Sequence, residues 1–401
     1  MASEEINEPS LYKWNEEIPA CVNSKPLKPR TRIPFTTFRI DNGTYEQSNI
    51  TFLSHFHSDH LNGLTKKKNP VVFATDTTCK ILQKTQAIPI VKSVTVNESI
   101  QYVPMEYNRA YVFTNAGAKK GNSKIKTVEK FLSRLPSSHR PPYQIYPTLG
   151  VNSDSDSPLL RVLLVVAIDA NHCPGSCMFS FSLYEGSKLT DMANIFSMLY
   201  TGDFRISPQI LSFVQGASLS LLHVDDTCYS KPNYHPLQLN DAVDLATRFI
   251  RREGTEKKVC FCCGVMRKEE FWMETVKALE KELPGGIYLD FLHWEYREFF
   301  IPRGSSIERR LVRDMAKAKY FIMDGKDALS VPGPRVVIDA DSNKAKNNTE
   351  GYCYIGYGRH CSKTELESFI TATRYCILSS IYNKIPKEKH RSVEDWTRVF
   401  K

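Results

Sequence analysis

The sequence predicts an α/β protein, and three observations lead to that class. Short apolar runs rich in β-branched residues alternate along the chain with segments of helical periodicity. The 401 residues are 41% hydrophobic and 24% charged, which is an ordinary globular composition with apolar material for two domains. The longest strongly apolar run, 162–168, is far shorter than the roughly 20 residues of a spanning helix. Neither a membrane span nor, given the acidic first residues, a secretory signal is expected.

The elements are expected in a fixed order. Residues 1–33 form an irregular basic arm because prolines are interspersed there with lysines and arginines. Apolar runs bounded by polar residues predict strands at 50–54, 71–74, 160–168, 178–183, 195–200, 219–224, 258–263, 335–338 and 376–381. Helical periodicity predicts helices at 236–250, 269–283 and 363–374.

The segment 105–160 interrupts this pattern and is predicted to be a long insertion with one short helix near 128–135. Between Arg109 and Arg140 it holds eight lysine or arginine residues against one acid, Glu129. A solvated surface loop and a loop that contacts nucleic acid fit this charge equally well. The net charge of +9 likewise fits either a polyanionic partner or a soluble protein that happens to be basic. Eleven scattered cysteines indicate free thiols, and the pair Cys260 and Cys263 indicates buried thiols more than a zinc site.

The residues most suited to metal binding follow predicted strands. Three of the ten histidines stand in the string His55-Phe-His57-Ser-Asp59-His60, directly after the strand 50–54. Imidazole and carboxylate groups are the ligands that hold zinc and similar metals, and α/β sheets place their sites at strand ends. His172 and Asp203 follow two further strands. A surface histidine cluster is the alternative, and four ligand-type residues within six disfavour it.

Three strings carry a family resemblance. SHFHSDHLNGL at 54–64, DANHCPGSCMF at 169–179 and LYTGDFR at 199–205 closely resemble the DNA cross-link repair nucleases, the group that includes Artemis and Apollo. This group forms part of the β-CASP branch of the metallo-β-lactamase superfamily. The resemblance implies a metallo-β-lactamase αββα sandwich at 34–228, which contains the insertion at about 105–160. A β-CASP cassette at 229–345 would follow, and the sandwich would return at 346–401, including the C-terminal tail.

The resemblance also implies a site with two metal ions. His55, His57 and His172 would bind the first, Asp59, His60 and His360 the second, and Asp203 would bridge them. Zinc is expected at one or both sites, with magnesium or manganese as the alternative at the second. Asp59, His60, Asp203 and His360 would take part directly in catalysis. Asp225 and Asp169 would orient ligand imidazoles, although Asp169 capping a turn is an alternative.

Further residues match the family's contacts with DNA. Thr227 and Ser362 match positions that line a pocket for a terminal 5′-phosphate, and Lys363 lies beside them. Arg205 would contact the DNA backbone or form a structural ion pair. Ile381 stands near the position where DNA-acting members have an aliphatic residue and RNA-acting members a histidine. The first strand departs from the family, since Phe-Thr-Thr-Phe replaces its Val-Asp-x-Phe string and Asp41 is offset.

These observations predict a nuclear, metal-dependent deoxyribonuclease, a 5′-to-3′ exonuclease that acts in interstrand cross-link repair, double-strand break repair or telomere-end processing. Its partner would be DNA with a 5′-phosphate, and repair or telomere proteins are possible further partners. Asn171 favours the exonuclease because a glycine replaces it in the hairpin-opening member. The alternatives are a structure-specific endonuclease for hairpins or flaps, an RNA-processing enzyme, a small-molecule hydrolase and a non-catalytic scaffold. Phe299, Phe300 and Trp294 are interpreted as core or cover rather than as base-stacking platforms.

Overall fold

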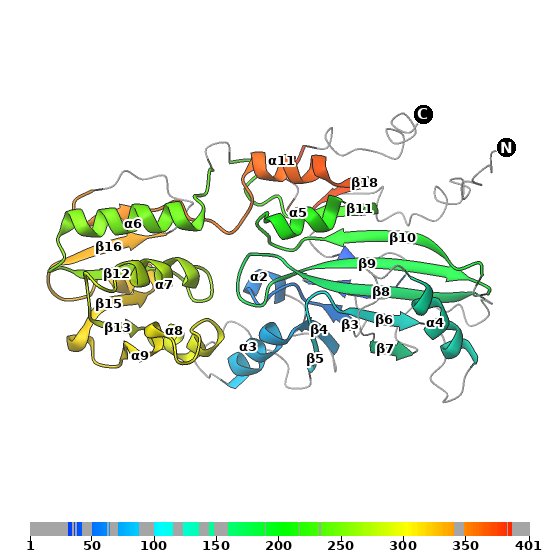
Figure 1. Ribbon diagram of the computed structural model, residues 1–401, viewed down its shortest axis with the longest axis horizontal. Coiled ribbons are helices and arrows are strands. Elements are labelled where there is room, and N and C mark those ends of the chain that lie inside the picture. Colours follow the sequence, from blue (N-terminus) through cyan, green and yellow to red (C-terminus); the bar gives the residue numbers. More distant parts are fainter. Residues whose placement is uncertain are drawn as a thin grey trace.

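The computed structural model describes residues 31–33, 36, 38–41, 50–61, 64, 71–87, 100–114, 123–135, 144–147, 159–188, 190–215, 217–231, 234–340, 349–382 and 384–386. The predicted basic arm at 1–33 therefore lies almost wholly outside the described residues. Two lobes lie side by side along the long axis of the molecule (Figure 1). The second lobe comprises residues 239–354, and the remaining described elements form the first lobe. Among the helices that the structure describes, none has the length and apolar character needed to cross a bilayer.

The first lobe is built on two sheets. The smaller has the order β1-β2-β3-β4-β5, formed by Thr31–Arg32, Arg39–Ile40, Ile50–Phe52, Val71–Thr75 and Gln101–Met105. The larger has the order β18-β11-β10-β9-β8-β6-β7, formed by Arg374–Ser380, Ser218–Val224, Ala193–Tyr200, Cys177–Gly186, Leu160–Asp169, Ala110–Thr114 and Gln144–Pro147. Apolar side chains from both sheets form one buried core. At its centre Phe52 contacts five aromatic rings at centroid distances of 5.3 to 5.9 Å, so the two sheets pack face to face.

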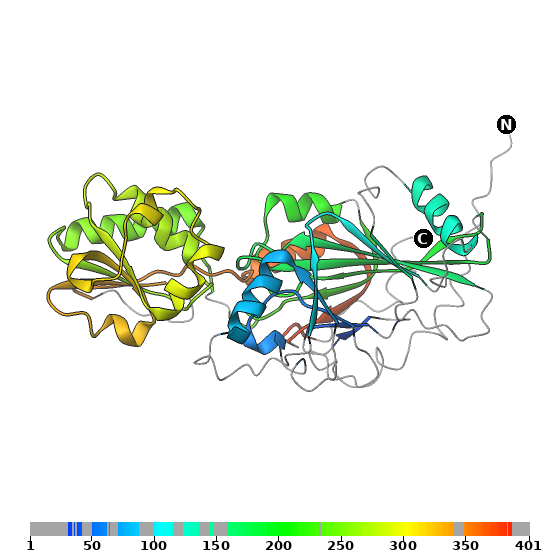
Figure 2. The same ribbon diagram turned by 90° about the horizontal axis from the view of Figure 1, so that it is seen from below.

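Helices cover the outer faces of both sheets. Helix α3 (Asp76–Ala87) packs on the smaller sheet, whereas α4 (Ser123–Arg134), α5 (Pro208–Gln215) and α11 (Lys363–Ala372) pack on the larger one. The one-turn helix α2 (Ser58–Leu61) follows β3. The result is four layers, helix, sheet, sheet and helix (Figure 2). The predicted α/β class is confirmed.

The second lobe is a six-stranded parallel sheet with helices on both faces. Its strand order is β14-β13-β15-β12-β16-β17, formed by Leu311–Val312, Gly286–Leu289, Ala318–Met323, Lys258–Cys262, Arg335–Asp339 and Tyr352–Tyr354. The accompanying helices are α6 (Leu239–Glu253), α7 (Glu269–Ala278), α8 (Phe291–Tyr296), η4 (Arg297–Phe299), α9 (Ser306–Arg309), η5 (Met315–Lys317) and α10 (Gly325–Ala328). Because every pairing in the sheet is parallel, both faces need cover, and its strands read as continuous apolar runs.

Two sequence predictions about boundaries need correction. The segment 105–160 is not simply an insertion, because all five residues of β6 are buried and the strand pairs with β8 and β7 in the larger sheet. The predicted short helix there corresponds to α4. The cassette was predicted to end at residue 345, but β17 pairs with β16 and so belongs to the second lobe. The chain returns to the first lobe after Tyr354.

Candidate metal centre

Seven histidine and aspartate residues meet where strands of both sheets of the first lobe end. His55 and His57 follow β3, α2 carries Asp59 and His60, His172 follows β8, and Asp203 follows β10. His360 lies on the segment that returns from the second lobe, just before α11. Their ligand atoms form three overlapping groups that share Asp203, and one of these groups also includes Asp225. The structure therefore brings together all seven residues that the sequence assigns to metal binding.

The atoms at the centre of this cluster are lone-pair donors that face one another. The Nε2 atom of His55 lies 3.0 Å from Nδ1 of His57, which lies 3.3 Å from Nε2 of His172. Oδ2 of Asp203 lies 3.8 and 3.7 Å from Nε2 of His55 and His172. Oδ1 of Asp203 faces His60 at 3.4 Å, and its Oδ2 faces His360 at 3.9 Å. Nitrogen and carboxylate donors at this spacing suit a divalent cation.

Four of the histidine rings in the cluster form a hydrogen bond through Nδ1, on the side of the ring opposite Nε2. The partners are the Ser54 hydroxyl for His55 (3.0 Å), the Arg359 carbonyl for His172 (3.1 Å), Asp41 for His60 (2.8 Å) and Asp225 for His360 (2.8 Å). A carbonyl or carboxylate only accepts hydrogen bonds, so Nδ1 of His172, His60 and His360 carries the proton. In the neutral form of each ring the Nε2 lone pair is thereby directed at the cluster, which is the arrangement that metal-binding histidines require.

Burial and charge divide the histidines into two kinds. Burial lowers the pKa of His55 and His172 well below the ordinary value, and it lowers the pKa of His57 to about 4. Burial acts in the same direction on His60, but Asp203 and Asp41 outweigh it and raise that pKa. The histidines of the first predicted site are therefore neutral at pH 7 and can bind a cation without first losing a proton.

Asp41 is part of the candidate site, although the sequence analysis described it only as offset from the family's position. Its carboxylate is buried at the end of β2 and accepts from the Ser54 amide (2.7 Å), the Ser54 hydroxyl (2.8 Å), the Tyr200 hydroxyl (2.7 Å) and His60 (2.8 Å). The backbone φ of Asp41 is +51°, a conformation that aspartate and asparagine adopt more readily than most residues. In the structure β2 pairs in parallel with β3, so Asp41 lies at the same edge of the sheet as the histidines that follow β3.

Tyr382 and Asp226 also belong to the site, although the sequence did not assign them to it. The Tyr382 hydroxyl donates to Oδ1 of Asp203 at 2.9 Å and lies 3.2 Å from Nε2 of His60. Asp226, at the end of β11, accepts hydrogen bonds from the Ser380 hydroxyl and from the amides of Tyr382, Lys384 and Ile385. Asp226 thus holds the loop that places Tyr382 at the cluster.

The residues predicted to contact DNA have other roles in the structure. Thr227 donates its hydroxyl to Asp225 at 2.6 Å, which fixes the partner of His360. Ser362 is buried and caps α11, where its hydroxyl accepts from the Glu365 amide. Arg205 is buried and donates to the carbonyls of Pro236, Leu237 and Gly358, so its structural alternative is the one supported. The phosphate roles of Thr227, Ser362 and Arg205 stay predictions, and the structure shows the intramolecular contacts that these groups make.

Two other predicted residues lie at the surface. Lys363 is exposed, and its amine lies 5.4 Å from the centre of the Tyr229 ring. A phosphate contact for Lys363 stays a prediction. Asp169 is exposed and accepts from the Asn171 amide at 2.8 Å, as expected for the turn-capping alternative. The structure shows no contact between Asp169 and a ligand histidine among the described interactions.

The fold and the site together define an α/β protein with a buried cluster of histidine and aspartate suited to divalent cations. No family model matches the chain. The DNA cross-link repair 1A protein of Mus musculus is 28% identical over 62% of this chain and 18% of that protein. The 5′ exonuclease Apollo of Mus musculus is 26% identical over 56% of this chain and 40% of that protein. Apollo of Danio rerio is 40% identical over 22% of this chain and 14% of that protein.

The chain is thus a relative of the DNA cross-link repair proteins of the Artemis and Apollo type. It spans less than half the length of these curated relatives. Several of them are named as cross-link repair proteins, and Apollo is named as a 5′ exonuclease.

Proposed function

We propose that the chain is a metal-dependent DNA nuclease that removes nucleotides from 5′ ends. The single observation that carries this proposal is the cluster around Asp203, where imidazole nitrogens from two strand ends, from helix α2 and from the returning segment face one carboxylate. The names of the relatives support DNA as the substrate and a 5′ terminus as the point of attack. The four helix and sheet layers and the inserted parallel domain support a metallo-β-lactamase sandwich that carries a β-CASP cassette.

In this proposal His55, His57 and His172 hold one zinc ion, and Asp59, His60 and His360 hold a second ion of zinc, magnesium or manganese. When bound, the cations would supply a lowered pKa for water and neutralise charge on the scissile phosphate. Asp203 lies between the two groups and orients toward both. Tyr382 keeps its proton, because burial raises the pKa of its phenol, and donates it in a hydrogen bond to Asp203. That bond fixes the carboxylate common to both groups.

The biological setting is part of the same proposal. We infer action in the nucleus, on ends produced by interstrand cross-link repair, double-strand breaks or telomere processing, with repair or telomere proteins as partners. DNA with a 5′-phosphate is the proposed substrate. Lys363 is the one residue of the predicted phosphate group whose charged end is exposed.

The experiment uses single-stranded DNA with a 5′-phosphate and a 3′ fluorophore, beside matched RNA and 5′-hydroxyl DNA. The variants are Asp203→Ala and, as a matched control on the surface, Asp191→Ala, because Asp191 is an exposed carboxylate of the same lobe. Stepwise shortening of the phosphorylated DNA alone, abolished by Asp203→Ala and by a chelator, is expected. Internal cuts would instead indicate an endonuclease, and cleavage of RNA would indicate a processing enzyme. No cleavage of any substrate by metal-loaded protein would overturn the proposal.

A further inference from the structure

A cavity of about 390 Å³ lies beside His172, and both lobes form its wall. The first lobe contributes Asp169, Asn171, His172, Cys173, Pro174 and Arg359, and the second contributes Arg267, Glu269, Glu270, Met273, Phe299 and Phe300. Contacts between the lobes hold the wall together, since Arg359 pairs with Glu270 and Lys84 pairs with Glu298. The hydroxyls of Thr85 and Tyr296 also meet across the lobes at 2.8 Å. A substrate strand that reaches the metal cluster would pass this wall.

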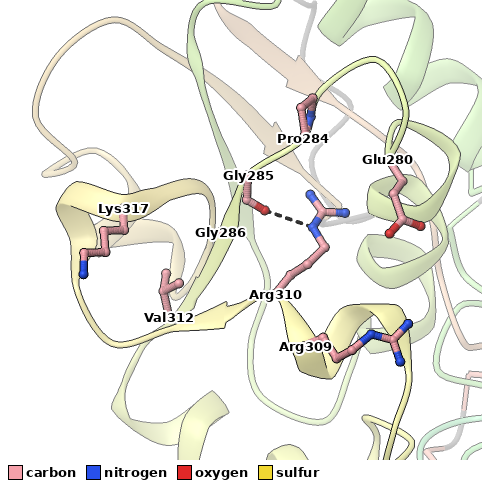
Figure 3. A pocket seen from close by; sticks show the side chains of 8 residues that line it. All are labelled: Glu280, Pro284, Gly285, Gly286, Arg309, Arg310, Val312 and Lys317. Atoms are coloured by element: carbon pink, nitrogen blue, oxygen red, sulfur yellow. Dashed lines mark hydrogen bonds between the residues drawn. The ribbon is translucent and has the colours of Figure 1, made fainter.

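The charge of this cavity does not suit a phosphate group. Three acidic residues line it against two arginines, and Arg359 is already paired with Glu270. A pocket of the same volume at the far end of the second lobe provides the contrast. There Arg309, Arg310 and Lys317 stand against Glu280 alone, and Arg310 projects into the middle of the pocket (Figure 3). The cavity beside His172 has the opposite balance, which disfavours an anion.

The same cavity does suit a flat, neutral group. Phe299 and Phe300 are partly buried, and each presents part of its ring to the cavity. Trp272 packs edge-on against Phe300 at a centroid distance of 6.3 Å, and Tyr296 lies 6.2 Å from Phe299. These neighbours restrain the two rings, and the Lys84 amine lies 5.9 Å from the centre of the Phe299 ring. Aromatic rings held in this way are the platforms on which nucleobases stack.

Glu269 adds a hydrogen-bonding group to the cavity wall. Its side chain is 4% exposed, and its Oε1 atom has no hydrogen-bond partner among the described residues. Backbone amides of the turn before α7, including those of Met266 and Arg267, interact with its carboxyl group. A buried oxygen without a partner is costly, and a ligand that pairs with it recovers that cost. Carboxyl groups pair with the exocyclic amino groups of cytosine and adenine.

We propose that this cavity binds a nucleobase of the substrate strand, stacked on Phe299 and Phe300 with one edge hydrogen-bonded to Glu269. The inference rests on the proposed nuclease function and names how the strand is positioned beside the metal cluster. Phe299 and Glu269 are then residues that determine specificity through the base, and the sugar–phosphate chain remains at the metal cluster. Bases with an amino group on the paired edge bind better than thymine.

The test separates base binding from catalysis. In EDTA, which prevents turnover, the full chain is titrated into a 5′-phosphorylated oligonucleotide whose terminal base is 2-aminopurine, a fluorophore that stacking quenches. Anisotropy then compares the affinity for a normal terminal nucleotide with that for an abasic one. The variants are Phe299→Leu, which preserves most of the volume, Glu269→Gln, and Phe291→Leu as the matched control. Phe291 lies on α8 in the same lobe, is 51% exposed and does not line the cavity.

Wild type and Phe291→Leu are expected to quench the fluorophore and to bind the abasic strand about 5- to 150-fold more weakly, as base–aromatic stacking predicts. Phe299→Leu is expected to lose the quenching and most of this discrimination while binding the abasic strand as wild type does. Equal affinity of the wild type for both strands would overturn the base pocket, whether or not the protein hydrolyses DNA. An equal loss on both strands in Phe299→Leu would also overturn it. Hydrolysis assays with magnesium or zinc report separately on the proposed nuclease function.

Discussion

Replacing Asp41 with asparagine should weaken both the fold and the metal cluster. Asparagine tolerates the φ of +51° and has nearly the same shape, so the backbone need not move. Its amide offers one acceptor oxygen where the carboxylate offers two, whereas the donors from Ser54, Tyr200 and His60 number four. Three of the donors meet Oδ2 and one, the Ser54 amide, meets Oδ1, so at least one donor loses its acceptor and faces the new amide N–H instead.

The expected magnitude follows from these contacts. Hydrogen bonds to a charged group contribute about 1.5–3 kcal/mol each, so the loss of one bond predicts a loss of at least about 1.5–3 kcal/mol in the free energy of unfolding. A typical domain has a free energy of unfolding of roughly 5–15 kcal/mol, so the variant should remain folded with measurably lower stability. Replacing a group that orients a metal-bound histidine typically lowers metal affinity about 10- to 100-fold.

Two measurements check this prediction. Urea unfolding in the presence of a chelator gives the stability of the metal-free chain, and competition with a chromophoric chelator gives the affinity for zinc. Asp191→Asn is the control, because the exposed Asp191 also accepts hydrogen bonds from a hydroxyl and an amide. Wild-type zinc affinity in Asp41→Asn would refute the role assigned to the His60 contact. An unchanged unfolding curve would refute the count of lost bonds.

Three further predictions follow from other parts of the structure. Arg205→Met should lower the unfolding midpoint and leave the salt dependence of DNA binding unchanged, because Arg205 contacts backbone carbonyls. A smaller dependence of DNA affinity on salt concentration in the variant would show that Arg205 contacts a phosphate instead. Burial raises the pKa of Glu269 above its ordinary 4.5, so the stability of the wild type should fall as the pH rises above 4.5. In thermal unfolding, the unfolding midpoint of Glu269→Gln should be higher than that of the wild type at pH 8 and equal to it at pH 4. A difference between the two midpoints that does not change with pH would contradict this. Zinc at 1,000 times its Kd should stabilise the chain by about 4 kcal/mol in calorimetry, and Asp203→Ala should abolish the shift; an equal shift in the variant would place the ion elsewhere.

Much of the framework could be predicted from the sequence because its strands are short apolar runs. The predicted strand 160–168 is β8, and the runs at 195–200 and 219–224 are β10 and β11. His55, His57, His60 and His172 follow such runs within a few residues, so local patterns pointed to them, whereas His360 was assigned only from the family resemblance. The strand β6 was missed because basic, polar sequence follows its short apolar run, 110–113, and conceals the end of the strand.

The groups that orient the site could not be predicted in this way, because their roles depend on contacts between distant parts of the chain. Tyr382 lies 179 positions from Asp203 and 322 from His60. Asp226 binds amides about 156 to 159 positions away. Glu269 becomes part of a cavity only when the second lobe packs beside His172. No local periodicity reports such pairings, since they arise from the topology by which β18 returns beside β11.

The position of His360 gives the molecule a thermodynamic property. This ligand lies on the segment that leaves the second lobe, and Arg205 joins that segment to the one that enters it by donating to both Gly358 and Leu237. In the proposed nuclease, a DNA strand that changed the position of the second lobe would therefore act on a proposed metal ligand as well. By linkage, the factor by which DNA changes metal affinity equals the factor by which metal changes DNA affinity. Substrate and cofactor would then bind as mutual effectors, and the metal content of the enzyme would depend on the supply of DNA ends.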